Sequence, residues 1–269
     1  MFGNTGMASS TCYPCPQDPF YLAVAKGDVP GHSLVHKFGS ATVGTTLSHI
    51  HTDGIYQTPT TAVALEFVSD NAGDNSAGLG AREVTIIGLD ANWEETTQTL
   101  ITNGVTPVQL DTDLVRLYRW YVSSSGVYSA LGLQPHLGNI EIRVSGGGAT
   151  WSTISNTPAS FSQSQIGFYT VPINKTAYLL SKHISVASTK IADVYFVQRP
   201  FADDVTTPFS GVRRIIEREV GLSSGFSITS VTPKGPYIGP CDLGFYGKVN
   251  LTTGVISVEF ELLIVDDGF

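Results

Sequence analysis

The sequence predicts a mainly β protein, an antiparallel β-sandwich of the jelly-roll kind, in one large or two small β domains with an extended N-terminal arm. Two observations lead to this prediction. Short segments alternate apolar and polar residues, which is the period of a strand with one buried face. Glycine and proline are numerous, 28 and 14 of 269 residues, and frequent turn residues between short strands are typical of sandwiches and barrels rather than of βαβ units.

Residues 1–30 are predicted to form the extended arm. Pro14, Pro16 and Pro19 interrupt them, and proline fixes φ and removes a backbone donor. Such arms are commonly disordered unless a neighbouring chain holds them. We therefore expect the arm to contact another subunit, through the apolar residues Phe20, Tyr21 and Leu22.

Residues 31–150 are predicted to form a first β unit. Its strands are expected within 62–67, 83–87, 97–101, 114–122 and 139–144. The fourth of these carries apolar residues at both parities, with Arg116 and Arg119 between them. This pattern indicates a largely covered strand whose arginine heads reach an edge or find a partner.

The composition changes at residues 145–165, which are rich in Gly, Ser and Thr. This indicates a long loop or a joint between two β units, and residues 151–269 are predicted to form the second unit. Its strands are expected within 166–171, 177–186, 193–198 and 256–264. The last is the clearest, because Ile256, Val258 and Phe260 share one face of a period-two pattern.

The segment 212–220 departs from the β pattern. Its apolar residues fall at 212, 215, 216 and 220, a helical spacing, and Arg213 and Glu217 would form an i,i+4 pair. We predict a short helix here, with a strand as the alternative because β-branched residues dominate.

Composition also bears on the class of function. With 15 basic and 23 acidic residues the formal charge is −8, so nucleic acid, which binds clustered Lys and Arg, is not an expected partner. The longest apolar runs fall short of the roughly 20 residues that span a bilayer, and neither a membrane partner nor a secretory signal is expected. Three cysteines do not make a disulfide framework.

Three motifs resemble catalytic or metal-binding patterns. Residues 221–225 match the G-x-S-x-G nucleophile motif around Ser223, but an alternating strand pattern follows it where the motif requires a helix. His49, His51 and Asp53 could supply metal ligands from one strand, yet nothing nominates a fourth ligand. Cys12 and Cys15 have C-x-x-C spacing in an irregular arm, with only Cys241 elsewhere. We predict no catalytic residue, no metal and no cofactor.

Two further patterns have ordinary structural interpretations. The loop 70–75 offers carboxylates and amides to calcium but lacks the spacing and closing Glu of an EF-hand, so we expect a solvated loop. The neighbouring 78–83 segment does not complete a phosphate-binding glycine motif. The aromatic residues Trp93, Trp151, Tyr118, Trp120 and Tyr121 could form a carbohydrate platform if exposed, but core packing is the expectation.

Several segments taken together resemble a family of virion structural proteins from tailed bacteriophages, frequent among marine podovirus-like phages. The resemblance covers most of residues 31–269 and does not include the arm or the histidines at 49 and 51. The segments are VHKFG at 35–39, ALEFVSD at 64–70, GLGAREVTIIGLDANW at 78–93, NGVTPV at 103–108, YTVPINKTAYL at 169–179 and VEFELLIVDD at 258–267. They are turn and strand pieces, so they imply a particle component without saying which one.

The leading hypothesis is a non-enzymatic virion structural protein that oligomerises on the particle, in a head-associated decoration, cement or spike role. Its expected partners are copies of itself and other phage particle proteins such as the major capsid protein. It would be located in the virion and assembled in the bacterial host cytoplasm. The alternatives are a tail or neck component, a carbohydrate-binding host-adhesion module using Trp93 or Trp151, and an esterase-like enzyme resting on Ser223 alone.

Overall fold

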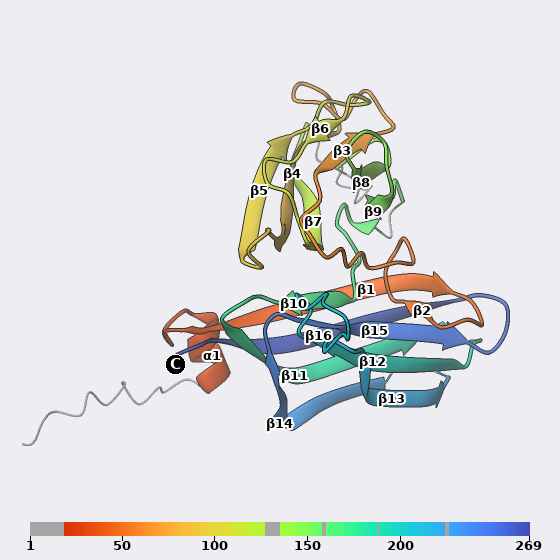
Figure 1. Cartoon of the computed structure of the whole chain (residues 1–269). Coiled ribbons are helices and arrows are strands. Elements are labelled where there is room, and N and C mark those ends of the chain that lie inside the picture. The colour runs from red at the N-terminus through yellow and green to blue at the C-terminus, as the bar shows by residue number, and fades with distance from the viewer. Residues whose placement is uncertain (1–18, 127–134, 158–159, 188, 224–225) are drawn as a thin grey trace, which may run out of the picture.

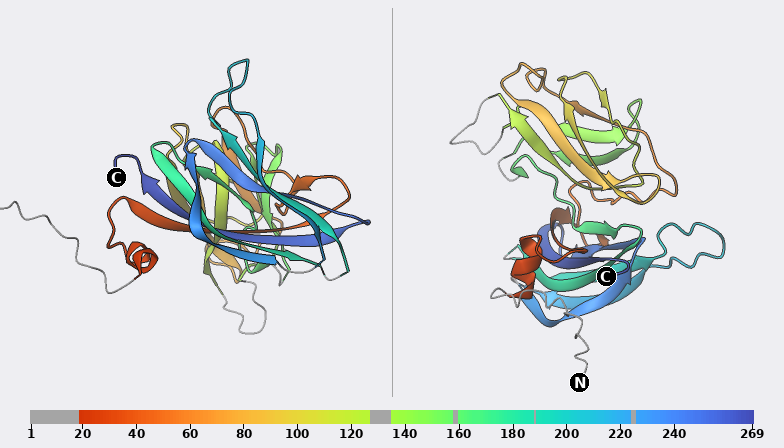
Figure 2. Two further views of the ribbon diagram at one scale, coloured as in Figure 1. Left: turned by 90° about the horizontal axis from the view of Figure 1, so that it is seen from below. Right: turned by 90° about the vertical axis from the view of Figure 1, so that its left-hand side faces the viewer.

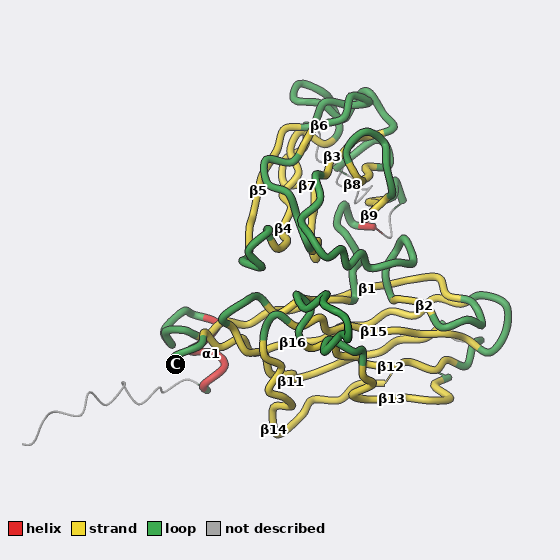
Figure 3. The backbone as a smooth tube through the Cα atoms, viewed as in Figure 1, coloured by secondary structure: helices red, strands yellow, loops and turns green. Residues whose placement is uncertain are grey.

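The chain is an antiparallel β protein, as the sequence predicts, and its strands form four sheets (Figures 1 and 3). The computed structural model describes residues 19–126, 135–157, 160–187, 189–223 and 226–269. The α-helix α1 (Phe20–Ala25) precedes the first strand. Among the described residues, no helix has the length and apolar character that a membrane span requires.

Eight strands make a jelly-roll body. Its first sheet has the order β1 (His32–Val43), β16 (Gly254–Asp266), β11 (Lys175–Val186), β14 (Phe226–Ile238). Its second sheet has the order β10 (Phe168–Val171), β15 (Cys241–Val249), β12 (Ala192–Pro200), β13 (Arg214–Leu222). Counted along the chain, the eight strands are ordered 1-8-3-6 and 2-7-4-5, the pairing that two interlocked Greek keys produce in a jelly roll.

The inner faces of these two sheets enclose the main core. The predicted alternation of β16 is confirmed, because Ile256, Val258 and Phe260 are all buried. The ring of Phe245 on the opposite sheet lies 5.5 Å from that of Phe260 and 4.9 Å from that of Phe196, centroid to centroid. Burial of such apolar area is the main stabilising contribution in a sandwich of this kind.

The second strand of the jelly roll is interrupted in its middle. The short strand β2 (Ser48–His49) pairs with Tyr246 and Gly247 of β15, and β10 continues the same line against 241–244. Between them the Ile50 amide donates to the Phe245 carbonyl at 2.8 Å, and the Phe245 amide donates to the Gly167 carbonyl at 3.1 Å. The chain therefore leaves the strand after Ile50 and returns at Gly167.

The interruption holds a second sandwich, residues 51–166, which stands above the jelly-roll body in Figure 1. We call it the inserted sandwich, and the body comprises residues 19–50 and 167–269. One sheet has the order β6 (Val108–Gln109), β3 (Leu65–Ser69), β8 (Ile140–Val144), β9 (Thr150–Ile154). The other has the order β5 (Glu95–Ile101), β4 (Ala81–Leu89), β7 (Arg116–Ser125). Phe67, Trp120 and Ile142 are buried between them.

The sheets do not divide at residue 150, where the sequence places a boundary between two β units. Strand β1 lies in the first predicted unit, yet it pairs along its whole length with β16 of the second. Strand β9 begins at the expected joint and pairs with β8, so Trp151 packs in the inserted sandwich. An insertion within a strand splits one sheet between distant segments, and local composition does not mark such a split.

The segment 212–220 is a strand, so the predicted helix is wrong. Residues 214–222 form β13 at the edge of the second sheet, paired with β12. A helical spacing is meaningful when its apolar residues share a buried face, but Ile215 and Val220 are 60% and 52% exposed. The β-branched residues follow their strand propensity and complete the sheet edge.

Within the predicted arm, residues 20–25 form helix α1 rather than an extended segment. Pro19 occupies its N-cap position, where the missing amide of proline is tolerated. Val24 is buried against Leu180 and Leu263 on the outer face of the first sheet. Cys12 and Cys15 lie outside the described residues.

Replacing Gly39 by alanine should destabilise the protein where the chain returns from the inserted sandwich. A Cβ at Gly39 would lie 2.1 Å from the backbone nitrogen of Gly167, so one of the two backbone segments would have to move. We expect a loss of about 2 kcal/mol in the free energy of unfolding, measured by urea denaturation. Gly44→Ala is the control, since its Cβ would have no atom nearer than 3.6 Å. Equal stability of the two variants would contradict this packing argument.

Candidate functional site

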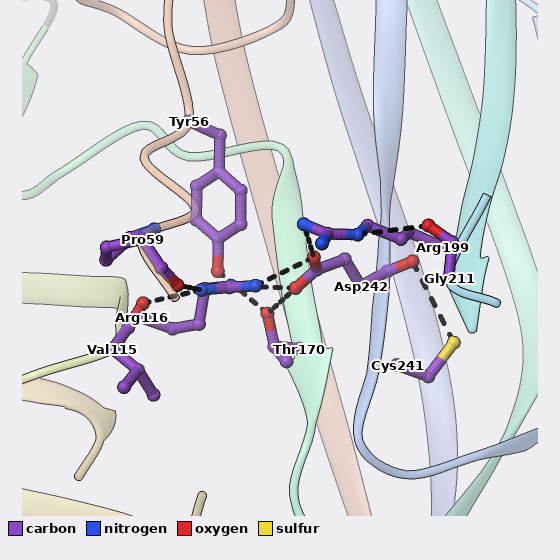
Figure 4. A network of polar contacts seen from close by, with 9 residues as sticks. All are labelled: Tyr56, Pro59, Val115, Arg116, Thr170, Arg199, Gly211, Cys241 and Asp242. Carbon is purple, nitrogen blue, oxygen red and sulfur yellow. Dashed lines mark hydrogen bonds and ion pairs between the residues drawn. The ribbon is translucent and has the colours of Figure 1, made fainter. Parts of the chain in front are cut away.

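A buried ion pair attaches the inserted sandwich to the jelly-roll body (Figure 4). Arg116 lies on β7 of the inserted sandwich and Asp242 lies on β15 of the body. The guanidinium donates from Nε to Oδ1 at 2.8 Å and from Nη2 to Oδ2 at 3.0 Å. Arg116 is 0% exposed, so this bidentate pair operates with little solvent screening.

Both N–H groups of Arg116 Nη1 are also used. Nη1 donates to the carbonyl oxygens of Pro59 at 3.0 Å and of Val115 at 2.7 Å. The guanidinium carbon lies 4.8 Å from the centroid of the Trp93 ring. A buried charge is tolerated when a partner and hydrogen bonds are supplied, and four of the five guanidinium N–H groups make hydrogen bonds here.

The carboxylate side of the pair is supported by two hydroxyls. Thr170 Oγ1 donates to Asp242 Oδ1 at 2.6 Å, and the Tyr56 hydroxyl lies 3.0 Å from Thr170 Oγ1. Arg199 on β12 adds a longer contact of 3.9 Å to Asp242 Oδ2. Tyr56 belongs to the inserted sandwich and Thr170 to the body, so this hydrogen-bond chain crosses the same junction (Figure 4).

Lys37 makes a second buried contact across the junction. It lies on β1 of the body, and its Nζ donates to the backbone carbonyl of Tyr118 on β7. Burial, together with the nearby positive charge of Arg119, lowers the pKa of Lys37 to about 7, while Glu95 acts in the opposite direction. The junction thus places an amine that titrates near neutral pH between the two sandwiches.

The inserted sandwich carries nearly all of the net charge. Residues 51–166 contain eleven acidic and four basic residues, a formal charge of −7. The body residues 19–50 and 167–269 contain eleven of each. The molecule is therefore a neutral jelly roll bearing a strongly acidic projection.

The predicted contact residues lie together on the outer side of α1. Phe20, Tyr21 and Leu22 are 45%, 41% and 43% exposed, while the opposite side of the helix is buried on the first sheet. The Phe20 ring packs edge-on against His32 at the start of β1, 5.8 Å between centroids. We call Phe20, Tyr21 and Leu22 the α1 surface; whether it binds another subunit stays a prediction.

The residues that resemble metal ligands are used in packing. His49 packs between the rings of Phe168 and Tyr246, at 5.0 and 4.4 Å, and burial lowers the pKa of His49 to about 4. The Nδ1 of His51 accepts the Asp53 amide at 3.0 Å. Within the part of the chain that the structure describes, no three His, Cys, Asp or Glu residues are grouped as a metal ion would require.

The motif around Ser223 lacks the geometry of a nucleophile elbow. Gly221 and Leu222 end strand β13, Ser223 follows it, and the next described residues begin strand β14. A nucleophile elbow needs a strand followed at once by a helix.

Cys241 is buried, which raises the pKa of its thiol to about 12 and leaves it protonated at neutral pH.

The carboxylates of the loop 70–75 hold the inserted sandwich together. Asp74 is fully buried and accepts hydrogen bonds from the Ser69 hydroxyl and from the amides of Ala81, Leu137 and Gly138, at 2.6 to 2.9 Å. Asp70 accepts the Asn139 amide at 2.8 Å. These carboxylates tie two distant loops together, so the expected solvated loop is instead a packed one at Asp74.

The tryptophans do not form an exposed platform. Trp93 is 8% exposed, Trp151 is 4% exposed and Trp120 is 0% exposed. The three indole rings pack in the cores, as the sequence predicts. A carbohydrate site built on Trp93 or Trp151 would require them at the surface.

An uncharged cleft of about 320 Å³ lies between β1 and the 153–165 segment. Sequence reasoning did not find it, because its walls come from segments far apart in the chain, and the only signal was the Ser and Thr content of 145–165. Its lining consists largely of hydroxyl and amide side chains: Ser40, Thr42, Thr52, Thr153, Ser155, Thr157, Ser160, Gln163 and Gln165.

No protein-family model and no curated protein matches the chain. Among solved structures, the infectious bursal disease virus VP2 subviral particle is similar at 12% identity, covering 88% of this chain and 73% of that one, with a TM-score of 0.26. The structure of the infectious bursal disease virus Gx strain is similar at 12% identity, covering 88% and 71%, with a TM-score of 0.25. Structural similarity at TM-scores this low does not bear on function.

Removing one partner of the Arg116–Asp242 pair should destabilise the protein strongly. Arg116→Met removes the bidentate partner of the buried Asp242 carboxylate and leaves it only the 3.9 Å contact to Arg199, so we expect a loss of about 3 to 5 kcal/mol in the free energy of unfolding. The double variant with Asp242→Leu should recover much of it, because no buried charge is left. Lys175→Met is the control: its ion pair with Asp266 is largely exposed and is worth about 1 kcal/mol or less. Chemical denaturation compares the wild type, the single variants Arg116→Met and Asp242→Leu, the double variant and the control; additive single effects would contradict the assignment.

Lys37 should make stability depend on pH. The unfolded lysine holds its proton up to about pH 10, whereas the folded pKa is about 7. Between these values the unfolded chain binds more protons than the folded chain, so the free energy of unfolding rises with pH. Below pH 7 Lys37 is protonated in the folded protein too, and the full cost of burying its charge applies. The free energy of unfolding of the wild type relative to Lys37→Met should therefore increase from about pH 7 to about pH 10. Lys26→Met, at an exposed lysine, is the control for the loss of one positive charge.

Proposed function

We propose that the chain is a virion structural protein of a tailed bacteriophage, a head-associated decoration, cement or spike component that acts through contacts between subunits. The α1 surface carries this proposal: three adjacent large apolar side chains, each more than 40% exposed, on a helix anchored firmly to the jelly-roll body. Exposed aromatic clusters on a rigid support are typical of protein–protein interfaces.

The division of the molecule supports the same proposal. A neutral body suits close packing against neighbours, because charged groups are depleted from the centres of interfaces. The acidic inserted sandwich stands away from the body, as a projection on a particle surface would. The proposed partners are copies of the chain and other particle proteins such as the major capsid protein, in virions assembled in the host cytoplasm.

The α1 surface should be required for incorporation into particles. We expect Phe20→Ser, Tyr21→Ser and Leu22→Ser together, or deletion of residues 1–22, to give a folded protein that enters virions at least about tenfold less, the ratio that 1.4 kcal/mol of lost contact produces. The measurement is the amount of tagged chain in purified particles, after expression in cells infected with the encoding virus.

A matched control changes three exposed apolar residues of the body, outside the α1 surface, to serine: Ile238, Leu251 and Val255. This control should enter particles normally. Gold labelling of the wild-type tag then distinguishes the head from a tail or neck position. Undiminished incorporation of the α1 variant would show that the anchor lies elsewhere, and absence of the wild-type chain from particles would refute the proposed function itself.

A further inference from the structure

Exposed apolar side chains are concentrated in residues 201–220, which we call the flap. It consists of the loop after β12, which projects from the body in Figure 2, and most of the edge strand β13. Its exposed apolar residues are Phe201, Val205, Phe209, Val212, Ile215, Ile216 and Val220, from 37% to 60% exposed. Such a concentration of exposed large apolar side chains in one segment is typical of a docking surface.

The flap also carries three exposed arginines. Arg213 lies over the Tyr246 ring and Arg218 over the Tyr195 ring, at 5.8 and 5.7 Å from the centroids, and Arg214 begins β13. The glutamates of β13 are occupied elsewhere, because Glu217 and Glu219 pair with the buried Lys182. The outward charge at the β13 end of the flap is therefore positive, whereas Asp203 and Asp204 lie in the loop before it, where Asp204 accepts hydrogen bonds from the amides of Thr206 and Ser210.

The opposite charge lies on the other half of the same molecule. Glu94, Asp111 and Asp113 are exposed on the inserted sandwich, whose formal charge is −7. Gln98 of β5 accepts the Asp111 amide at 2.8 Å, so this loop lies beside the strand that Glu94 precedes. Strand β5 is, like β13, the edge of its sheet.

We propose that the flap of one copy binds the acidic inserted sandwich of a second copy. Aromatic residues, aliphatic residues and arginine are the types that interface centres favour, and the 20 or so residues of the flap match one side of a standard interface. Two different surfaces meet in this contact, so it is heterologous and repeats into a ring or an array. The inference deepens the proposed assembly function, but the purified chain tests it without any particle.

The test uses three full-length variants, compared by sedimentation velocity over a concentration series with reducing agent present. The flap variant is R213E/R214E/R218E, and the projection variant is E94K/D111K/D113K. The control K26E/K190E/K248E changes the net charge of the body as much as the flap variant does. Thermal unfolding checks that each variant is folded.

We expect the wild type and the control to self-associate, more weakly as salt screens the contact. The flap and projection variants should each associate at least about tenfold more weakly, because each opposes like charges. Mixing the two variants should restore association, since each then meets the opposite charge on the other.

A wild-type chain that stays monomeric at low salt, or a flap variant that associates as well as the control, would overturn the inference. A weakened flap variant beside an unaffected projection variant, with no gain on mixing, would show that the flap binds some other surface. None of these outcomes bears on the α1 surface, so the proposed function can stand if this contact fails.

Discussion

The buried Arg116–Asp242 pair is the interaction on which the arrangement of the molecule depends. A guanidinium and a carboxylate removed from water are unfavourable unless their charges and hydrogen bonds are matched closely. That requirement defines how β7 of the inserted sandwich lies against β15 of the body, with Pro59, Val115 and Thr170 completing the set. Apolar surface alone would permit sliding, whereas a bidentate pair has one geometry.

The same junction explains how a jelly roll tolerates 116 residues placed inside a strand. Ile50 and Gly167 both hydrogen-bond to Phe245, so the strand beside β15 is almost continuous although residues 51–166 are inserted into it. The two ends of the inserted sandwich are therefore both held by backbone hydrogen bonds to Phe245. Its acidic surface is held away from a neutral body, and this separation of charge lets one part of the molecule pack while the other repels or attracts neighbours at a distance.

Several residues that resemble reactive groups are structural, for a common physical reason. Asp74, His51 and Trp93 are buried, and a buried polar group is stable only when its hydrogen bonds are made within the protein. Asp74 thereby joins two loops separated by 63 residues. Sequence patterns identify the residue types that chemistry uses, but burial decides whether a carboxylate or an imidazole is free to act.

The sequence by itself determined the class of fold, because period-two alternation is a local property and β16 shows it over its buried residues. It also indicated that the head of Arg116 would reach an edge or find a partner, and it proposed Phe20, Tyr21 and Leu22 for subunit contact. Only the tertiary structure decided the rest. The partner of Arg116 is 126 residues away, β1 pairs with the far end of the chain, and the apolar spacing of 212–220 belongs to an exposed strand edge. Such relations arise from which distant segments meet, and no window of neighbouring residues contains that information.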